Sequence, residues 1–190
     1  MGLDPTAQQV KIVYQGKTKK GKDILVRYPE MGDLEKLLNF INEISDERTF
    51  IRYQGEHETR KSEEKWLKGR LEEIDKKKTV HLLAFSGDEL AGTTEIHLRD
   101  KTEKHIGVLG ITVAKIFRGQ GIGKTLMDLI IREAVKELSG LRLIILEVYS
   151  TNENAKNLYR KMGFVDYGIL PEGITRSDKF EDAILMYKKI

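Results

Sequence analysis

A glycine-rich segment in the second half of the chain sharply limits the possible folds. It reads Arg118-Gly119-Gln120-Gly121-Ile122-Gly123-Lys124-Thr125 and stands between a predicted strand over 105–113 and a predicted amphipathic helix over 122–138. Alternating glycines let the backbone turn tightly and approach a ligand closely. The first N–H groups of a helix lack partners within the helix, and the helix dipole adds positive potential there. The segment therefore predicts a loop that binds a phosphate or pyrophosphate group.

Three phosphate-binding patterns compete for this segment. The dinucleotide fingerprint G-x-G-x-x-G fails because Gly123 falls one residue too early. The nucleotide-hydrolase pattern G-x-x-x-x-G-K-[ST] matches at Gly123-Lys124-Thr125, but its first position is occupied by Arg118 instead of glycine. The third pattern, R-x-x-G-x-G, is complete. A nucleotide-binding loop and a glycine-rich turn without a ligand remain alternatives at this point.

Strands and helices interleave along the rest of the chain, which predicts a layered α/β fold. The strand over 141–149 is rich in Leu, Ile and Val, so we expect it to be buried on both faces. Ser150 and Glu153 have the spacing of a capping box and are expected to open a short helix that ends at Gly163. Residues 1–22 are predicted to form an N-terminal arm or edge strand, and residues 23–190 one domain. The other predicted strands span 23–28, 80–85, 89–98, 164–170 and 182–187, and the other helices 34–44 and 62–75.

Composition excludes several classes of function. The chain has no cysteine, which excludes disulfides, a thiolate nucleophile and the usual structural zinc sites. Its 33 basic and 30 acidic residues leave a net charge of only +3, so we expect no nucleic-acid partner. The longest apolar run, 183–187, is far shorter than the roughly 20 residues of a membrane span, and the first residues lack a signal-peptide pattern. We therefore expect a cytoplasmic protein without a membrane partner, and the four histidines show no ligand spacing that would predict a metal site.

Further matching residues accompany the complete R-x-x-G-x-G pattern: Leu146-Glu147-Val148, Asn152, Ala155, Leu158-Tyr159, Gly163-Phe164 and 181–186. With these residues the sequence resembles the GNAT superfamily of acyl-CoA-dependent N-acetyltransferases, whose R/Q-x-x-G-x-G/A loop holds the pyrophosphate of acetyl-CoA. The resemblance covers residues 105–190. Within the superfamily this part is most similar to the N-terminal alanine acetyltransferases of ribosomal proteins. Residues 24–98 agree in the order of elements but carry no motif for an acceptor.

The resemblance implies a single α/β domain with a mixed, mostly antiparallel twisted sheet of six to seven strands, flanked by about four helices. The strands near 105–113 and 141–149 are expected to splay into a V. The pantetheine arm of acetyl-CoA would enter this V and pair with main-chain groups of the first strand. The donor-binding residues that the resemblance implies are Ile111, Thr112, Val113, Arg118, Gly119, Gln120, Gly121, Ile122, Gly123, Lys124 and Asn152.

The resemblance also implies two catalytic residues. Glu147 matches a strand glutamate that acts as general base, and Tyr159 matches a tyrosine near the thioester sulfur. An alkyl amine is mostly protonated at neutral pH and must lose a proton before it attacks the thioester. Glu147 alternates with Leu143 and Ile145 on one strand face, so we expect apolar neighbours around its carboxylate. Glu95 is a second candidate base, and a packed core position for Tyr159 and an ion pair for Glu147 are the structural alternatives.

The predicted function is transfer of an acetyl group from acetyl-CoA to a primary amine by direct attack in a ternary complex, with Tyr159 protonating the departing thiolate. An acyl-cysteine intermediate is excluded because the chain has no cysteine. The expected acceptor is a protein N-terminal amine or a small amine or amino acid, with a lysine side chain as a third class. An exposed final strand would allow a homodimer. The alternatives are a non-catalytic acyl-CoA-binding sensor and a P-loop-type nucleotide-binding protein.

Overall fold

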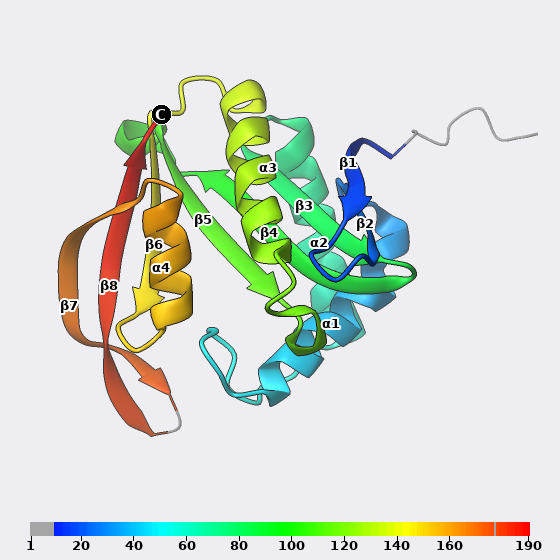
Figure 1. The fold of residues 1–190 in the computed structure, drawn as a ribbon. Helices are drawn as coiled ribbons and strands as arrows, with labels where there is room; N and C mark the ends of the chain where they lie inside the picture. The colour runs from blue at the N-terminus through cyan, green and yellow to red at the C-terminus, as the bar shows by residue number, and fades with distance from the viewer. Residues whose placement is uncertain (1–9, 177) are drawn as a thin grey trace, which may run out of the picture.

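A mixed sheet of eight strands runs through the middle of the molecule (Figure 1). The computed structural model describes residues 10–176 and 178–190. Within these residues the strands follow the order β1-β2-β3-β4-β5-β6-β8-β7 across the sheet, and β5 with β6 is the one parallel pair. The strands are β1 (Ile12–Lys17), β2 (Asp23–Arg27), β3 (Thr79–Ser86), β4 (Glu89–Leu98), β5 (Ile106–Val113), β6 (Leu143–Tyr149), β7 (Val165–Arg176) and β8 (Lys179–Lys189). The fold is therefore the mixed, mostly antiparallel α/β domain that we expected.

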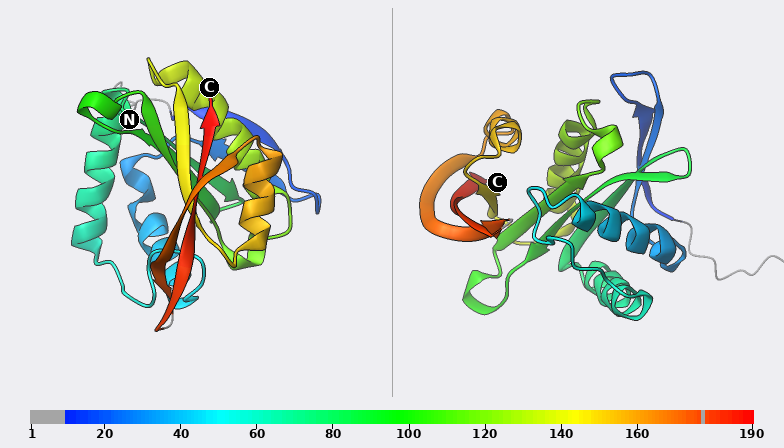
Figure 2. Two further views of the ribbon diagram at one scale, coloured as in Figure 1. Left: turned by 90° about the vertical axis from the view of Figure 1, so that its left-hand side faces the viewer. Right: turned by 90° about the horizontal axis from the view of Figure 1, so that it is seen from below.

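Helices cover both faces of this sheet. In the described part of the chain the α-helices are α1 (Leu34–Asp46), α2 (Arg60–Asp75), α3 (Ile122–Glu137) and α4 (Glu153–Lys161), and 3₁₀ turns span Met31–Asp33, Lys101–Glu103 and Lys115–Phe117. The pair α1 and α2 lies on one face, and α3 and α4 lie on the opposite face (Figure 2). None of these helices combines the length and the apolar character that crossing a membrane requires.

Each face has its own hydrophobic core, built by helical periodicity. On the α3 face the fully buried residues of the helix recur every three or four positions, as a helix packed on a sheet requires: Ile122, Leu126, Ile130 and Ala134. On the other face a smaller cluster joins α1 and α2 to β3 and β4: Leu34, Leu37, Phe40, Ile44, Leu67, Leu83, Phe85 and Leu90. The α1–α2 layer is therefore anchored through few positions, which leaves room between helices and sheet.

The strands β5 and β6 pair only at their beginnings. Their pairing runs from Ile106 opposite Leu143 to Val108 opposite Ile145 and then stops. Meanwhile β4 stays paired with β5 as far as Val113, and β8 stays paired with β6 to its end. The two central strands therefore diverge, and residues 109–113 have no strand partner on the β6 side. This confirms the V-shaped splay expected between the strands near 105–113 and 141–149.

The sheet has eight strands instead of the six to seven expected. The predicted edge strand near residues 10–14 is β1, which pairs with β2, while residues 1–9 of the predicted arm lie outside the described residues. The last two strands are also longer than predicted. The strand predicted over 164–170 continues past Leu170, because the β7–β8 pairing takes up the intervening residues in a register shift between Leu170 and Ile174 and then resumes.

The predicted capping box at Ser150 is wrong. The N-cap of α4 is Asn152, whose side-chain oxygen accepts a hydrogen bond from the Ala155 N–H at 3.1 Å. The Ser150 N–H instead donates to the Asp182 carbonyl of β8 at 2.9 Å, so Ser150 still bonds to the neighbouring strand just after the end of β6. The helix therefore begins two residues later than a cap at Ser150 would place it.

The expectation that the strand over 141–149 is buried on both faces is also wrong. Ile144, Leu146 and Val148 are buried on one face, but Glu147 on the other face is exposed. The splay is the reason, because it removes β5 from the side of β6 and opens that face to solvent.

Candidate active site

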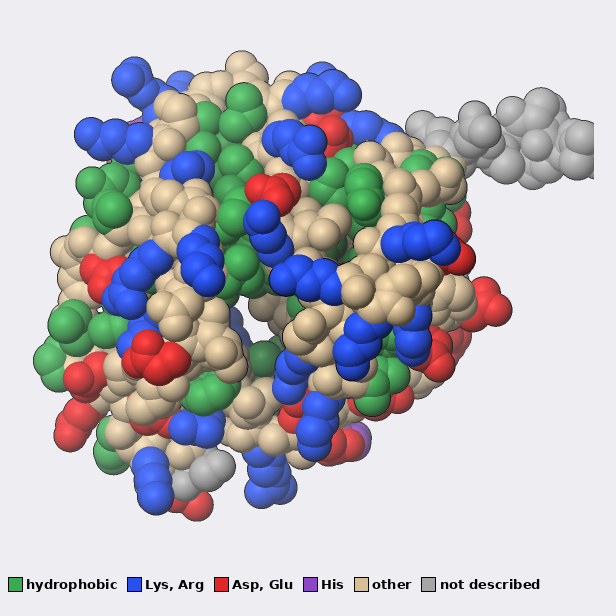
Figure 3. Space-filling view, viewed as in Figure 1, with side chains coloured by type: hydrophobic (Ala, Val, Ile, Leu, Met, Phe, Trp, Pro, Cys, Tyr) green, Lys and Arg blue, Asp and Glu red, His purple; other side chains and the backbone are tan. Residues whose placement is uncertain are grey.

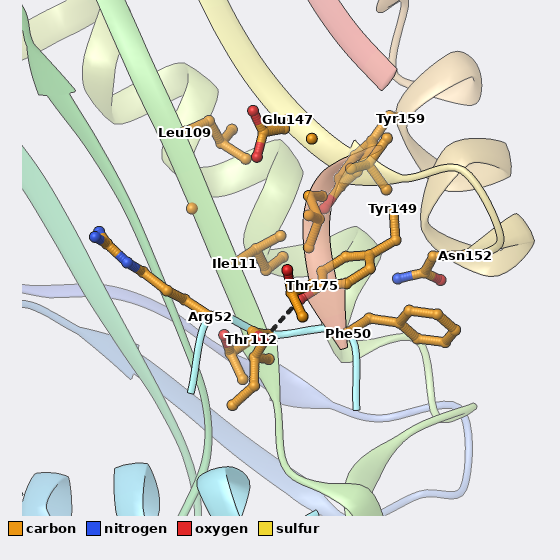
Figure 4. Close-up of a pocket in the computed structure, with 15 residues that line it drawn as sticks. Phe50, Arg52, Leu109, Ile111, Thr112, Glu147, Tyr149, Asn152, Tyr159 and Thr175 are labelled. Atoms are coloured by element: carbon orange, nitrogen blue, oxygen red, sulfur yellow. Dashed lines mark hydrogen bonds between the residues drawn. The ribbon is translucent and has the colours of Figure 1, made fainter. Parts of the chain in front are cut away.

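A cavity of about 580 Å³, which we call the splay cavity, occupies the space where β5 and β6 diverge (Figure 4). In the space-filling view, which shows the same side of the molecule as Figure 1, the surface is hollowed near its centre (Figure 3). Its walls come from β5 (109–112), β6 (147–149), the loop between α1 and α2 (50–52) and β7 (173–175), with Asn152 and Tyr159 from α4 and its cap. Elements distant in sequence thus meet around one opening.

The loop between α1 and α2 closes one side of the splay cavity. The Tyr149 hydroxyl, on β6, donates a hydrogen bond to the Ile51 carbonyl at 2.8 Å. The Phe50 ring packs edge-on against Tyr149 at 5.5 Å between centroids, and the Arg176 guanidinium lies 4.6 Å from the centroid of Phe50. These contacts fasten the loop across the V. Tyr149 and Arg176 could not be predicted from the sequence, because their roles depend on contacts across the sheet.

The glycine-rich segment forms a second opening beside the first, which we call the loop cavity, of about 560 Å³. Gly119 and Gly121 have positive φ values of +73° and +88°, a conformation that glycine adopts without strain. Gly121 is the N-cap of α3, so the unpaired N–H groups at the start of that helix face this region. The loop cavity and the splay cavity adjoin each other, and we call the two together the channel; six residues line both: Phe50, Ile51, Ile111, Thr112, Asn152 and Tyr159.

The predicted donor-binding residues fall into two groups. Ile111, Thr112, Val113, Arg118, Gly119, Gly121, Ile122, Gly123 and Asn152 line the loop cavity. Gln120 and Lys124 do not. The Gln120 side chain is buried inside the loop, where its amide donates to the Ile116 carbonyl at 2.9 Å, and Lys124 is exposed.

The Arg118 side chain is engaged by protein partners. Its guanidinium forms an ion pair with Glu47 at 2.7 Å and donates to the Val113 carbonyl at 2.9 Å. Glu47 follows α1, so this contact joins the glycine loop to the start of the α1–α2 loop. An anion that binds Arg118 must therefore compete with the Glu47 carboxylate.

Tyr159 reaches the junction of both cavities from α4. Its side chain is buried and packs near Phe164 at 6.1 Å between ring centroids. Among the described residues no group hydrogen-bonds to its hydroxyl, and the residue lines both cavities. Burial raises the pKa of Tyr159 to about 12, because the phenolate is disfavoured away from water. At neutral pH the phenol is therefore a protonated donor without a partner in the described part of the chain.

The two candidate bases lie on different cavities. Glu147 lines the splay cavity, where Figure 4 shows it opposite Leu109; it is exposed, which corrects the apolar surroundings expected for it. No described Lys or Arg forms an ion pair with Glu147. Glu95, on β4, instead lines a cavity between the sheet and the helices α1 and α2, and it pairs with the Arg70 guanidinium at 3.2 Å.

A third cavity of about 380 Å³ lies between the sheet and the helices α1 and α2, and we call it the α1–α2 cavity. It meets the splay cavity at Gly110, Ile111 and Thr112 of β5. Its polar lining includes Glu63, which the sequence analysis missed. Glu63 stands four residues before the fully buried Leu67, so helical periodicity alone places it on the buried face of α2.

Comparison with known proteins gives a consistent family. Residues 38–164 match the model of the acetyltransferase (GNAT) family. An acetyltransferase of the GNAT family from Streptococcus pneumoniae superposes with a TM-score of 0.80 at 31% identity, over 88% of this chain and 99% of that one.

Two further similarities concern the fold and part of the sequence. A ribosomal-protein-alanine N-acetyltransferase from Brucella melitensis shares the fold at 24% identity, with a TM-score of 0.78 over 87% of this chain and 99% of that one. An uncharacterized N-acetyltransferase from Methanocaldococcus jannaschii is 34% identical over 82 residues, which is 43% of this chain. The chain spans only half the length of that relative.

Proposed function

The chain belongs to the acetyltransferase (GNAT) family, and on this basis we propose that it transfers an acetyl group from acetyl-CoA to a primary amine, which attacks the thioester directly in a ternary complex. The observation that carries this proposal is the pair of adjoining cavities that reach from the N-terminus of α3 to the splay between β5 and β6. Their arrangement, with a helix N-terminus that can bind an anion at one end, fits a donor with a pyrophosphate at one end and a thioester at the other.

The donor would lie along this channel. The N–H groups around Gly119, Gly121 and Gly123 would bind the pyrophosphate, because both positive φ values turn the main chain at the start of α3. The pantetheine arm would pair with main-chain groups of 111–113, which have no strand partner on the β6 side. Asn152 lines the same channel. A structure from Salmonella typhimurium with the same fold, at 15% identity and a TM-score of 0.76 over 87% of this chain and 93% of that one, contains acetyl-CoA as its cofactor.

Glu147 would accept the proton that the ammonium group of the acceptor must lose. Its exposed carboxylate on the wall of the splay cavity can receive that proton directly or through one water molecule. The amine nitrogen then forms a bond to the thioester carbon, the carbon–sulfur bond breaks to release the thiolate, and the nitrogen loses its second proton to solvent as the amide forms. The main-chain N–H of Val113 is a candidate donor to the carbonyl oxygen as negative charge develops there.

Tyr159 would hydrogen-bond the sulfur as it leaves. With a pKa of about 12, its phenol is a much weaker acid than a thiol, whose reference pKa is about 8.5. Complete proton transfer from Tyr159 to the thiolate is therefore unfavourable. We accordingly assign to Tyr159 a hydrogen bond that stabilises the thiolate, with the proton on sulfur supplied later by Glu147 or by solvent.

Calorimetric titration with acetyl-CoA, run beside Mg·ATP, tests the donor. We expect binding of acetyl-CoA and no heat from ATP; binding of ATP alone would show a nucleotide-binding protein. Acetyl transfer to a panel of amines tests the reaction. Glu147→Gln should lower kcat by about 100-fold and Tyr159→Phe by about tenfold, while the exposed control variants Glu103→Gln and Tyr167→Phe should not. Binding of acetyl-CoA without transfer to any amine would instead support a non-catalytic acyl-CoA sensor.

A further inference from the structure

The α1–α2 cavity combines apolar walls with carboxylates. Leu37, Phe40 and Ile41 of α1 and Trp66 of α2 supply the apolar part of its lining. Three carboxylates line it: Glu58, Glu63 and Glu95. The described lining residues include no Lys and no Arg. A volume of about 380 Å³ is near the lower end of pockets that hold small molecules. An aliphatic ligand of modest size would fit the space.

Glu63 has no partner among residues 10–176 and 178–190. The residue is only 6% exposed, and no described side chain or main-chain group forms a hydrogen bond or ion pair with its carboxylate. Burial, together with the nearby Glu58, raises the pKa of Glu63 to about 7. A buried carboxylate without a partner is unfavourable for folding, and such groups are normally paired. Because Glu63 lines the cavity, a cation in the cavity is the partner that it lacks.

The other charged groups around the cavity leave it negative. Glu58 accepts a hydrogen bond from the Tyr53 hydroxyl at 2.9 Å, and bonds from Ser62 and Tyr53 lower its pKa, so it is ionised at neutral pH. Glu95 is neutralised by its ion pair with Arg70 at 3.2 Å.

The remaining titratable groups of the described lining are Tyr53, whose pKa is raised by burial and by its hydrogen bond to Glu58 so that it is neutral, and His81, which is fully buried and neutral. Burial lowers the pKa of His81 to about 3, and its Nε2 pairs with the Thr93 hydroxyl at 2.6 Å. The uncompensated charge of the cavity is therefore that of Glu58 and Glu63, both at the beginning of α2 or just before it.

The position of the cavity connects this charge to the reaction. Gly110, Ile111 and Thr112 of β5 border both the α1–α2 cavity and the splay cavity. A ligand in the α1–α2 cavity can therefore place one end beside the strand along which the donor is proposed to lie. Its other end would lie at the start of α2, near Glu63 on the helix and Glu58 in the loop just before it.

We propose that the acceptor is an aliphatic diamine or polyamine, whose distal ammonium group binds Glu63 and Glu58 while its other amine is acetylated beside β5. This inference rests on the acetyl transfer proposed above. The apolar side chains of α1 and Trp66 contact the methylene chain, and the two carboxylates select for the second charge. The first residue of a peptide that begins with alanine or serine carries no second cation beside its reacting amine, and such a residue would leave Glu63 unpaired.

Matched substrates test the proposal. With acetyl-CoA as donor, kcat/KM is measured for 1,5-diaminopentane and for n-pentylamine, which has the same chain but lacks the second ammonium. Hydrogen bonds to charged groups contribute enough that we expect the diamine to be favoured by about tenfold or more. Glu63→Gln keeps the shape of the side chain and should reduce this preference by about tenfold. The control Glu72→Gln changes an exposed glutamate on the same helix and should keep the preference intact.

Glu58→Gln provides a second variant, because the hydrogen bonds between Glu58 and Asn42 involve the main chain of Glu58 and survive the change. It should reduce the preference in the same direction. A binding measurement that does not need catalysis uses Trp66, which lines the cavity and is the single tryptophan of the chain. Titration with 1,5-diaminopentane should change its fluorescence, and Glu63→Gln should weaken the apparent affinity by about tenfold.

The outcomes separate this inference from the proposed function. Equal kcat/KM for the diamine and n-pentylamine, or a preference for alanine-starting peptides, would overturn the diamine assignment and leave acetyl transfer standing. Binding of the diamine that depends on Glu63, without any acetyl transfer, would overturn the proposed function and keep the cation site. A preference for the diamine that is unchanged in both Glu63→Gln and Glu58→Gln would show that other residues select it and would refute the inference.

Discussion

Replacing the unpaired Glu63 by glutamine should stabilise the protein above neutral pH but not in acid. A pKa of about 7 in the folded protein, against 4.5 for the ordinary group, means that the folded state keeps the proton longer than the unfolded chain does. As pH rises from 4.5 to 7, the unfolded state therefore gains relative to the folded state. The wild-type protein loses stability over this interval, and Glu63→Gln removes the loss.

The size of the effect follows from the pKa difference. At 1.36 kcal/mol per pH unit, a shift from 4.5 to about 7 corresponds to about 3.4 kcal/mol. The carboxylate borders a cavity that water enters, so solvent screening reduces this value to about 2 kcal/mol. Above pH 7 the free energy of unfolding of Glu63→Gln should exceed that of the wild type by about this amount. At pH 4.5 and below, where the wild-type carboxyl is protonated, the two should be nearly equal.

Urea unfolding at several pH values between 4.5 and 8, followed by far-ultraviolet circular dichroism, measures this difference. All other titrating groups are common to both proteins and cancel when the two curves are subtracted. The control Glu72→Gln, on the exposed side of α2, should give a difference that does not vary over this pH range. A constant difference between Glu63→Gln and wild type from pH 4.5 to 8 would refute the reasoning, because it would mean that Glu63 titrates normally in the folded protein.

Three other perturbations have expected outcomes. Gly121→Ala forces an L-residue to a φ of +88°, which costs roughly 1–2 kcal/mol of left-handed strain. The variant should bind acetyl-CoA about tenfold more weakly, as measured by calorimetry, which is a loss of similar size. Gly87→Ala has similar strain at a φ of +61° in the β3–β4 turn and should lower the unfolding free energy without changing that affinity. Asn152→Ala removes the α4 cap and should lower the unfolding free energy by about 1 kcal/mol in urea titrations, whereas Asn152→Asp should preserve it. Tyr149→Phe deletes the hydrogen bond to the Ile51 carbonyl and should lower the unfolding free energy by about 1 kcal/mol. Amide exchange measured by mass spectrometry should also accelerate in residues 49–53. Unchanged exchange would show that Phe50 holds the loop alone.

The donor half of the candidate site was accessible to sequence reasoning because its signals are local. The glycines at 119, 121 and 123 act through backbone geometry, and α3 follows them directly, so contiguous residues specify both the turn and the helix N-terminus. Gln120 shows the limit of such reasoning. Its place in the motif does not reveal that its side chain turns inward to the Ile116 carbonyl. The ion pair between Arg118 and Glu47 joins residues far apart in the chain, and no spacing in the sequence indicates it.

The acceptor half was not accessible in the same way. The α1–α2 cavity is made where two helices, a loop and three strands meet, and each contributes only one to three residues of ordinary type. Helical periodicity does place Glu63 on the buried face with Leu67, but burial alone does not show whether a carboxylate has a partner. Strand register also determines which cavity each of the two candidate bases faces. With Thr94 opposite Ile111 and Glu95 opposite Gly110, Glu95 faces the α1–α2 cavity, whereas Glu147 faces the splay.

The position of β5 explains why the donor half of the site could be predicted from the sequence and the acceptor half could not. Residues 110–112 border both the splay cavity and the α1–α2 cavity, so one strand separates the proposed donor side from the proposed acceptor side. In the proposed arrangement the donor would bind main-chain groups of β5 and the start of α3, which side-chain substitution hardly alters. The proposed acceptor side is lined by the side chains of α1, α2 and the loop that joins them, which can change without disturbing the glycine turn. We therefore expect acceptor preference to depend on individual side chains such as Glu63, and the way to determine it is to vary those side chains against matched amines.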